Sequence, residues 1–170
     1  MGDLHSGKGA RDMKAIWVPI LFCMICGHPL ATTAADLSGV PRVIDGDTLE
    51  IQDQRVRLHG IDTPEARQTC TRDGVEWLCG QEASKALREY LQDKPPIYCE
   101  QIDTDRYRRI VAKCFTQSGE DIGEWMVRNG WALAYRRYST DYIEAETNAK
   151  NAGRGIWAGE FAEPWNWRRR

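Results

Sequence analysis

The alternation of apolar and polar residues between positions 39 and 61 predicts three short strands. Residues 48–52 and 55–61 each alternate with a period of two, and a tight turn at residues 53–54 separates them. Residues 39–45 form a further run, which is weakened by Pro41. A period of two places every second side chain on one face, so we expect half-buried antiparallel strands.

The remaining chain mixes helical and strand periods. Residues 81–92 place apolar side chains at helical spacing on one face, and Pro95-Pro96 ends that pattern. The other expected elements are strands at 97–102, 110–116 and 131–135 and helices at 120–129 and 142–152, with a loop at 62–80.

This order favours an α+β protein that is mainly β. Three strands follow one another directly with tight turns, which argues against a βαβ parallel sheet. Short strands with helices between some of them suit a five-stranded OB-type β-barrel with three packed helices.

The N-terminal residues 1–35 are predicted to be a secretory signal rather than part of this fold. Basic residues precede an apolar run at 15–26, and the small residues Thr33, Ala34 and Ala35 follow it. We expect cleavage near Ala35, with an uncleaved anchor as the alternative and Met13 as an alternative start. The globular domain is then residues 36–160, and residues 161–170 form an aromatic and basic tail.

Four cysteines lie outside the predicted signal: Cys70, Cys79, Cys99 and Cys114. An even number in an exported protein indicates disulfides. The spacing favours Cys70–Cys79, which would close the long loop, and Cys99–Cys114, which lie symmetrically about a predicted hairpin turn. A four-thiolate zinc site is the alternative, but the close pairs typical of such sites are missing from this set.

Charge does not single out a partner. Without residues 1–35, the chain holds 20 basic and 23 acidic residues, a net charge of −3. A strongly basic domain would point to nucleic acid. Attraction to phosphate must therefore be local, at arginine clusters such as residues 106–109, 136–137 and 168–170.

Carboxylates gather at the ends of the first three strands. If the first and third strands adjoin, Asp47 and Asp62 come together, with the carbonyl oxygen of Thr63 beside them. Such oxygen donors suit Ca²⁺ or Mg²⁺ better than zinc. The alternative is ordinary turn chemistry, since Asp and Gly are frequent in turns.

Arginines near these carboxylates extend the hypothesis to a phosphodiester site. Arg57 lies within the third strand and Arg109 begins the fifth, and both can donate forked hydrogen bonds to phosphate oxygens. Glu65 is placed to accept a proton from water. The alternatives are a surface arginine and a solvated turn charge.

Taken together, the motifs resemble the staphylococcal nuclease (thermonuclease) family from about Val40 to Trp157. The motifs are I-D-G-D-T (44–48), R-L-x-G-I-D-T-P-E (57–65), G-x-E-A (80–83), D-R-Y-x-R (105–109), W-M-V-R-N-G-W-A (125–132) and G-I-W (155–157). The resemblance implies a Ca²⁺-dependent nuclease that acts on DNA and RNA, cleaves the P–O5′ bond and leaves 3′-phosphates.

The resemblance also implies roles for individual residues. Asp47, Asp62 and Thr63 match the calcium ligands, Glu65 matches the residue that handles the attacking water, and Arg57 and Arg109 match the phosphate-binding arginines. The nucleotide-contacting positions of the family match Arg106, Tyr107 and Tyr138. One departure is Arg108, because the family usually has glycine at this position. The sequence therefore leaves open whether Arg108 or Arg109 is the second phosphate-binding arginine.

The sequence leaves a second class of function open. A non-catalytic OB-type module that binds nucleic acid or protein in the cell envelope has the same fold, and a structural envelope protein that uses its tail is a third reading. For the nuclease, we expect a secreted or periplasmic monomer with DNA and RNA as substrates and no stable membrane association after signal cleavage.

Overall fold

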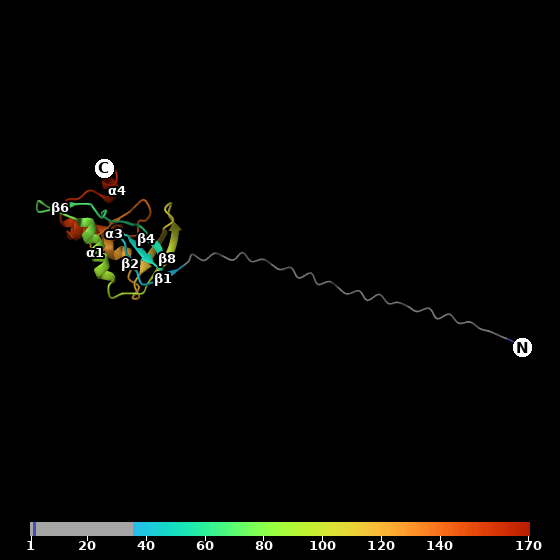
Figure 1. Ribbon diagram of the computed structural model, residues 1–170. Helices are drawn as coiled ribbons and strands as arrows, with labels where there is room; N and C mark the ends of the chain where they lie inside the picture. Colours follow the sequence, from blue (N-terminus) through green and yellow to red (C-terminus); the bar gives the residue numbers. More distant parts are fainter. Residues whose placement is uncertain (1, 3–35) are drawn as a thin grey trace. The chain divides into compact units, whose positions relative to one another are not determined.

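A six-stranded sheet forms the centre of the computed structural model, which describes residues 36–170 together with Gly2. The strands across the sheet are β1 (Leu37–Gly39), β8 (Ile97–Thr104), β9 (Ile110–Phe115), β4 (Gln54–Leu58), β3 (Thr48–Ile51) and β2 (Arg42–Val43). Neighbours are antiparallel except β4 and β9, which run parallel. Figure 1 labels β1, β2, β4 and β8 of this sheet. The predicted signal lies outside the described residues, apart from Gly2.

Two smaller sheets flank the central one. β5 (Ile61–Asp62) pairs with β10 (Leu133–Ala134), so that Asp62 lies opposite Leu133. β6 (Cys70–Arg72) and β7 (Val75–Trp77) form a hairpin.

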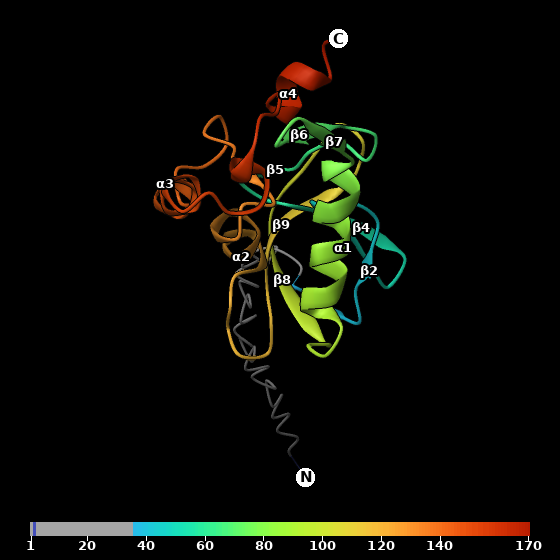
Figure 2. The same ribbon diagram turned by 90° about the vertical axis from the view of Figure 1, so that its left-hand side faces the viewer.

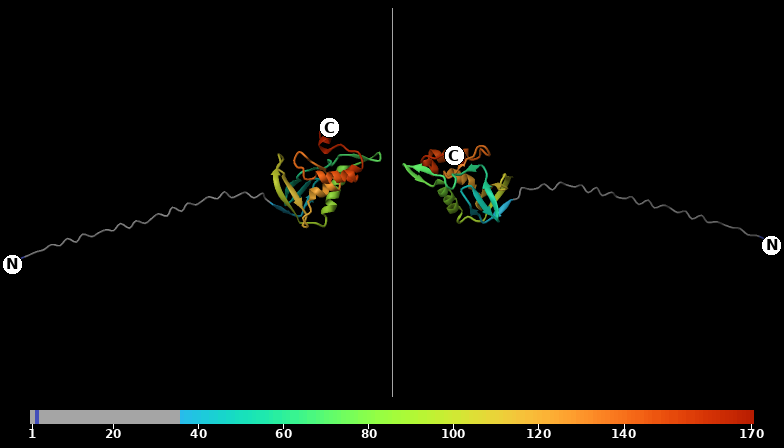
Figure 3. Two further views of the ribbon diagram at one scale, coloured as in Figure 1. Left: turned by 180° about the vertical axis from the view of Figure 1, so that it is seen from behind. Right: turned by 45° about the horizontal axis from the view of Figure 1, so that its top comes forward.

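The helices are α1 (Cys79–Leu91), α2 (Ile122–Arg128), α3 (Ile143–Asn151), the 3₁₀ turn η1 (Gly155–Ala158) and the short α4 (Pro164–Trp167). Figure 3 shows α1 to α3 gathered on one side of the strands. In the part of the chain that the structure describes, no helix is both long enough and apolar enough to cross a membrane.

The main core lies between this sheet and the helices. Leu49 and Val56 are fully buried from the sheet, and Leu87 is fully buried from α1. The 3–4 spacing of the apolar residues of α1 explains why this helix packs along one face. Burial of each such side chain stabilises the fold by about 1.5–3 kcal/mol.

A second, smaller core holds the C-terminal segment. Its buried residues are Cys70, Cys79, Leu133 and Ile156, and partly buried aromatic rings of Trp77, Trp157, Phe161 and Trp165 pack against them. Thr71 and Glu160 form a β-bridge, so residues 159–163 lie beside the β6–β7 hairpin. Both the hairpin and α4 therefore lie at one end of the domain (Figure 2).

Both predicted disulfides, Cys70–Cys79 and Cys99–Cys114, are present. Cys99 and Cys114 lie directly opposite each other on β8 and β9, as the predicted hairpin requires. Loops of 9 and 15 residues correspond to about 2.5–3 kcal/mol of stabilisation each.

The α+β class, with mostly strands and three principal helices, is confirmed. One prediction for the strands is wrong, and one condition considered for them is not met. The run at 39–45 divides at Pro41 into β1 and β2, because proline has no N–H to continue the ladder. The first and third predicted strands do not adjoin, since β3 lies between β2 and β4.

The predicted loop at 62–80 is also wrong in part, because it contains the β6–β7 hairpin. Asp73 and Gly74 both adopt positive φ, of 53° and 76°, at the two-residue turn. Asp-Gly is a strong hairpin signal. Each of its strands has only three residues, fewer than the four to eight over which alternation predicts a strand.

Candidate active site

The turn before β3 carries the first carboxylate against Thr63. Asp47 is 5% exposed, and the backbone N–H of Thr63 lies 3.4 Å from its Oδ2 atom. A Cβ atom added to Gly46 would lie 2.8 Å from Thr63 Oγ1, so a side chain there would push the two segments apart. Glycine in the Asp45-Gly46-Asp47 turn is therefore what lets Asp47 and Thr63 meet.

Arg57 on β4 joins the two buried carboxylates. Its Nη1 donates to Asp47 Oδ1 at 2.7 Å, and its Nη2 donates to Asp62 Oδ1 at 3.0 Å. Asp62 is fully buried on the short strand β5. The carboxylates thus come together through the arginine between them, and adjoining first and third strands are not needed.

Glu65 is held at the edge of this group by its backbone. Its N–H donates to Oε1 of the fully buried Gln68 at 3.1 Å. A Cβ atom on Gly80 would lie 1.8 Å from the Glu65 carbonyl oxygen, which requires glycine at this point of α1. The G-x-E-A motif therefore lets the first turn of α1 pack against the Glu65 backbone, while the Glu65 side chain remains 41% exposed.

Arg168, which the sequence analysis did not single out, is the other basic residue of the site. Its Nη1 donates to Glu65 Oε1 at 2.6 Å and lies 3.1 Å from Asp62 Oδ1, and its Nη2 donates to Asp62 Oδ2 at 2.7 Å. These contacts span 106 residues of sequence from Asp62. The three arginines at 168–170 form a basic cluster in the sequence, but no spacing rule connects that cluster to residues 62–65.

Carboxylates and guanidinium groups therefore alternate in the order Asp47, Arg57, Asp62, Arg168, Glu65. Burial raises the pKa of the Asp62 carboxyl, and the hydrogen bond from Arg168 opposes that rise. Burial also raises the pKa of the nearby Asp45 carboxyl to about 6, and the charge of Asp47 adds to this effect. Acidic groups are thus crowded here, beyond what the arginines neutralise.

The second arginine expected at the site, Arg109, does not contact these carboxylates in the structure. Its Nε and Nη2 atoms both lie 2.8 Å from Asp105 Oδ2, and Asp105 also accepts from the Arg109 backbone N–H. Arg108 is exposed and adopts a φ of 67°, the left-handed conformation that glycine takes most readily. The loop therefore keeps a glycine-like backbone at Arg108 and fixes the position of Arg109.

The predicted nucleotide-contacting side chains line the surface around these loops. Tyr107 is 65% exposed, with the guanidinium of Arg106 4.8 Å from its ring centroid, and it lines a shallow hollow of about 350 Å³ together with Arg109. Tyr138 is 61% exposed and packs edge-to-face on Tyr135. Exposed aromatic rings beside arginines suit stacking on bases.

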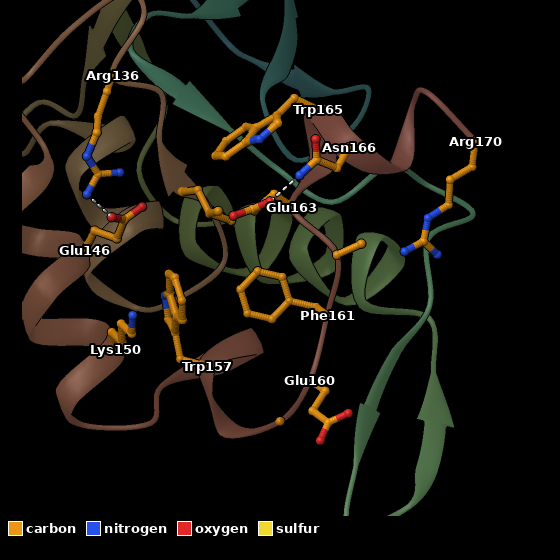
Figure 4. Close-up of a pocket in the computed structure, with 13 residues that line it drawn as sticks. Arg136, Glu146, Lys150, Trp157, Glu160, Phe161, Glu163, Trp165, Asn166 and Arg170 are labelled. Atoms are coloured by element: carbon orange, nitrogen blue, oxygen red, sulfur yellow. Dashed lines mark hydrogen bonds and ion pairs between the residues drawn. The ribbon is translucent and has the colours of Figure 1, made fainter.

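A larger open pocket of about 890 Å³ lies beside α4 (Figure 4). The rings of Trp157, Phe161 and Trp165 line it, and Trp165 stacks on Tyr135 with ring centroids 5.5 Å apart. Its charged side chains largely pair with one another or with rings, as Figure 4 shows for Arg136 and Glu146. With three basic and three acidic residues in its lining, this pocket does not select the charge of a ligand.

The donors at the first site fit a hard divalent cation. Asp47, Asp62 and the carbonyl of Thr63 offer the oxygen atoms that Ca²⁺ prefers. In residues 36–170, no three acidic, histidine or cysteine side chains stand together as a ready-made metal cage, because guanidinium groups separate the carboxylates. A cation bound to Asp62 would therefore replace at least one of its arginine contacts.

Comparison with known proteins agrees with this site. The family model described as "Staphylococcal nuclease homologue" matches residues 55–159. An uncharacterized endonuclease of Escherichia coli is 34% identical over 145 residues, covering 80% of this chain and 88% of the relative. The succinoglycan biosynthesis protein ExoI of Rhizobium meliloti (strain 1021) is 36% identical over 162 residues, covering 92% of this chain and 82% of that protein.

More distant relatives include a probable staphylococcal-like nuclease, CAN1, of Oryza sativa subsp. japonica. It is 29% identical over 127 residues, which cover 73% of this chain and 35% of that protein. The family match spans more than half of the chain and includes Arg57, Asp62, Glu65 and Arg109. The chain belongs to the staphylococcal nuclease family.

Proposed function

We propose that this protein is an exported Ca²⁺-dependent nuclease that hydrolyses phosphodiester bonds of DNA and RNA and leaves 3′-phosphates. The observation that carries the proposal is the row of ion pairs that links Asp47, Arg57, Asp62, Arg168 and Glu65 in that order, in a chain of a nuclease family. The non-catalytic alternative is less favoured, because a purely binding module does not need buried, paired carboxylates at these positions.

Each residue has a proposed role. Asp47, Asp62 and the Thr63 carbonyl hold the cation. Arg57 donates to a phosphate oxygen and also holds the Asp47 and Asp62 carboxylates in place. Glu65 accepts the proton of the attacking water. When bound, Ca²⁺ supplies Lewis-acid polarisation of the phosphate and a site for that water.

Substrate binding is assigned to the exposed loops. Arg109 neutralises charge that develops on the phosphate, and Arg106, Tyr107 and Tyr138 contact the flanking nucleotides. Arg109 must exchange its present partner, Asp105, for phosphate, and its guanidinium lies 5.6 Å from the ring centroid of Tyr107, which is assigned to the same substrate.

The wider organisation is part of the same proposal. Residues 1–35 are a cleaved signal, residues 36–160 the nuclease domain, and residues 161–170 the tail of a secreted or periplasmic monomer without stable membrane association. The two disulfides support an oxidising compartment. We infer that the central sheet closes as an OB-type barrel. Gln52, just after β3, donates to the carbonyl of Ser38 on the opposite edge strand β1, at 3.0 Å, which supports that closure.

Only this nuclease activity is carried over from the relatives. The name of ExoI refers to succinoglycan biosynthesis by that protein. The residues that form the site here are those of the nuclease pattern, so we propose no role in polysaccharide synthesis.

Digestion of nucleic acid with and without calcium tests the proposal. We expect purified protein to cleave plasmid and single-stranded DNA, and RNA, in Ca²⁺ and to stop in excess EGTA, because the carboxylates need the cation to bind phosphate. Product ends are identified by phosphatase treatment and mass spectrometry. Intact substrate in both tubes, together with measurable binding of the nucleic acid, would favour the non-catalytic module.

Alanine substitutions at positions 108 and 109 test which arginine serves the phosphate. Arg109→Ala is expected to lower the cleavage rate by about 10², the size seen when one charge-stabilising donor is lost. Arg108→Ala, an exposed neighbour, serves as the matched control and is expected to cleave at close to the wild-type rate. A slow Arg108→Ala variant beside a normal Arg109→Ala variant would show that the assignment is reversed.

A further inference from the structure

The C-terminal arginine Arg168 occupies the same carboxylate oxygens that the proposed function assigns to the cation and to the attacking water. Both oxygens of Asp62 accept hydrogen bonds from guanidinium groups: Oδ1 from Arg57 and Arg168, and Oδ2 from Arg168 alone. The same Nη1 atom of Arg168 also reaches Glu65. A fork that binds two carboxylates in this way is a strong, charge-assisted contact.

The segment that carries Arg168 is fixed in place by several independent contacts. The side-chain Nε2 of Gln68 donates to the carbonyl of Ala162 at 2.6 Å. Trp165 stacks on Tyr135, and the buried Pro164 begins α4. Arg168 follows α4 directly, so these contacts of the C-terminal segment place its guanidinium beside Asp62.

A divalent cation would compete with the Arg168 guanidinium for Oδ2 of Asp62, an oxygen atom that Arg57 does not contact. Like charges only a few ångströms apart in a partly buried site repel strongly, because little water screens them. One of the two arginines on Asp62 must therefore yield when a cation binds.

The structure indicates which arginine yields. Arg57 lies within β4, its side chain is 21% exposed, and it has Asp47 as a second partner. Arg168 follows the short α4, outside the central sheet, and its side chain is 38% exposed. Arg168 can turn into solvent without disturbing the sheet, whereas Arg57 cannot.

Resting on the proposed function, we propose that Arg168 is a tethered competitor of the divalent cation. It binds Asp62 and Glu65 in the cation-free protein and must be displaced before the site can bind the cation. The tail thereby sets the cation concentration at which the site fills, and it keeps the carboxylates paired when no cation is present.

Calorimetric titration of CaCl₂ into the folded protein, without nucleic acid, tests this directly. Arg168→Ala is expected to bind Ca²⁺ about tenfold more tightly than wild type, the size of effect expected when a hydrogen-bonded charged competitor is removed. Arg169→Ala, an exposed neighbour, is the matched control and should bind as wild type does. Arg168→Lys keeps the charge without the fork and should fall between the two.

Thermal melting gives a second readout that also serves if the alanine variant is unstable. Without calcium, Arg168→Ala should melt below wild type, because the buried Asp62 loses a partner. Saturating calcium should raise the melting temperature of the variant more than that of wild type. Two results together overturn the proposal. Arg168→Lys binds calcium with the affinity of wild type, and calcium raises the melting temperatures of Arg168→Ala and wild type by the same amount.

The outcomes separate this inference from the proposed function. Equal calcium affinities of wild type and Arg168→Ala overturn the competition, and normal cleavage by both would leave the nuclease intact. Tighter binding by the variant supports the competition even if no substrate is cleaved, and in that case only the proposed function fails. If no variant binds a divalent cation, both the competition and the assigned cofactor are wrong.

Discussion

Glu65→Gln is expected to lower the rate of phosphodiester cleavage by about 10²–10⁴, the range for loss of general acid–base help. Glutamine has nearly the same shape as glutamate but carries no charge, so it cannot take the proton of the attacking water. The Glu65 backbone is held by Gln68 and by the close approach of Gly80, and neither contact involves the Glu65 side chain. The substitution should therefore change the chemistry and leave the position of residue 65 unchanged.

The measurement must separate chemistry from cation binding, because Glu65 also pairs with Arg168. Rates should be compared at saturating Ca²⁺, where any change in cation affinity no longer affects the rate. Because the Glu65 side chain is partly exposed, weakening its ion pair with Arg168 should lower the free energy of unfolding by no more than about 1 kcal/mol. Glu89→Gln on α1, whose ion pair with Lys85 is 3.9 Å long, provides the matched control. A Glu65→Gln variant with wild-type rates under these conditions would remove this residue from the mechanism.

The sequence predicts the position of a site residue best when its partners lie close to it along the chain. Asp47, Arg57, Asp62 and Glu65 lie within 19 consecutive residues, and strand alternation with turn residues fixes their relative positions. The structure brings Asp47, Arg57 and Asp62 into direct contact, and Glu65 is linked to Asp62 only through Arg168. The two disulfides were predictable because each joins cysteines close in sequence, Cys99–Cys114 across a predicted hairpin and Cys70–Cys79 across a predicted loop.

Features that depend on distant packing were not predictable from local patterns. Arg168 reaches Asp62 only because Trp165 packs on Tyr135 and Ala162 accepts a hydrogen bond from Gln68. No hydrophobic periodicity in residues 161–170 predicts those contacts. The role of Gln68, which contacts both Glu65 and Ala162, also could not be predicted, because no sequence pattern distinguishes a buried glutamine from an exposed one.

The loop that carries Arg109 could be predicted only in part. The sequence identified the motif and the unusual Arg108, and the structure shows that Arg108 adopts the left-handed backbone expected of glycine. It does not bring Arg109 to the carboxylates, because Asp105 offers a nearer partner four residues away. A phosphate is the group that would draw the guanidinium inward, and sequence periodicity carries no information about that competition.

Removal of Arg57 is expected to have the largest combined effect on activity and stability. Arg57→Ala removes the guanidinium that joins Asp47 to the fully buried Asp62, so Asp47 loses its ion-pair partner and Asp62 keeps only Arg168. Breaking a buried ion pair from one side costs about 3–5 kcal/mol, so the variant should melt well below wild type. Because Ca²⁺ would screen the same two carboxylates, it should restore part of the lost stability, and thermal melting with and without Ca²⁺ measures both effects.

Arg57→Lys separates the structural from the catalytic role of Arg57. Lysine keeps a positive charge near the carboxylates but cannot place two donors in a fixed fork, so it cannot hold Asp47 and Asp62 while donating to phosphate. We expect a protein that folds but cleaves about 10²–10³ times more slowly at saturating Ca²⁺. Arg88→Lys, on the exposed face of α1, is the control for the substitution itself. If Arg57→Lys cleaves at a rate near that of wild type, charge alone suffices at this position, and the forked contact to phosphate would have to be assigned to Arg109 or Arg168.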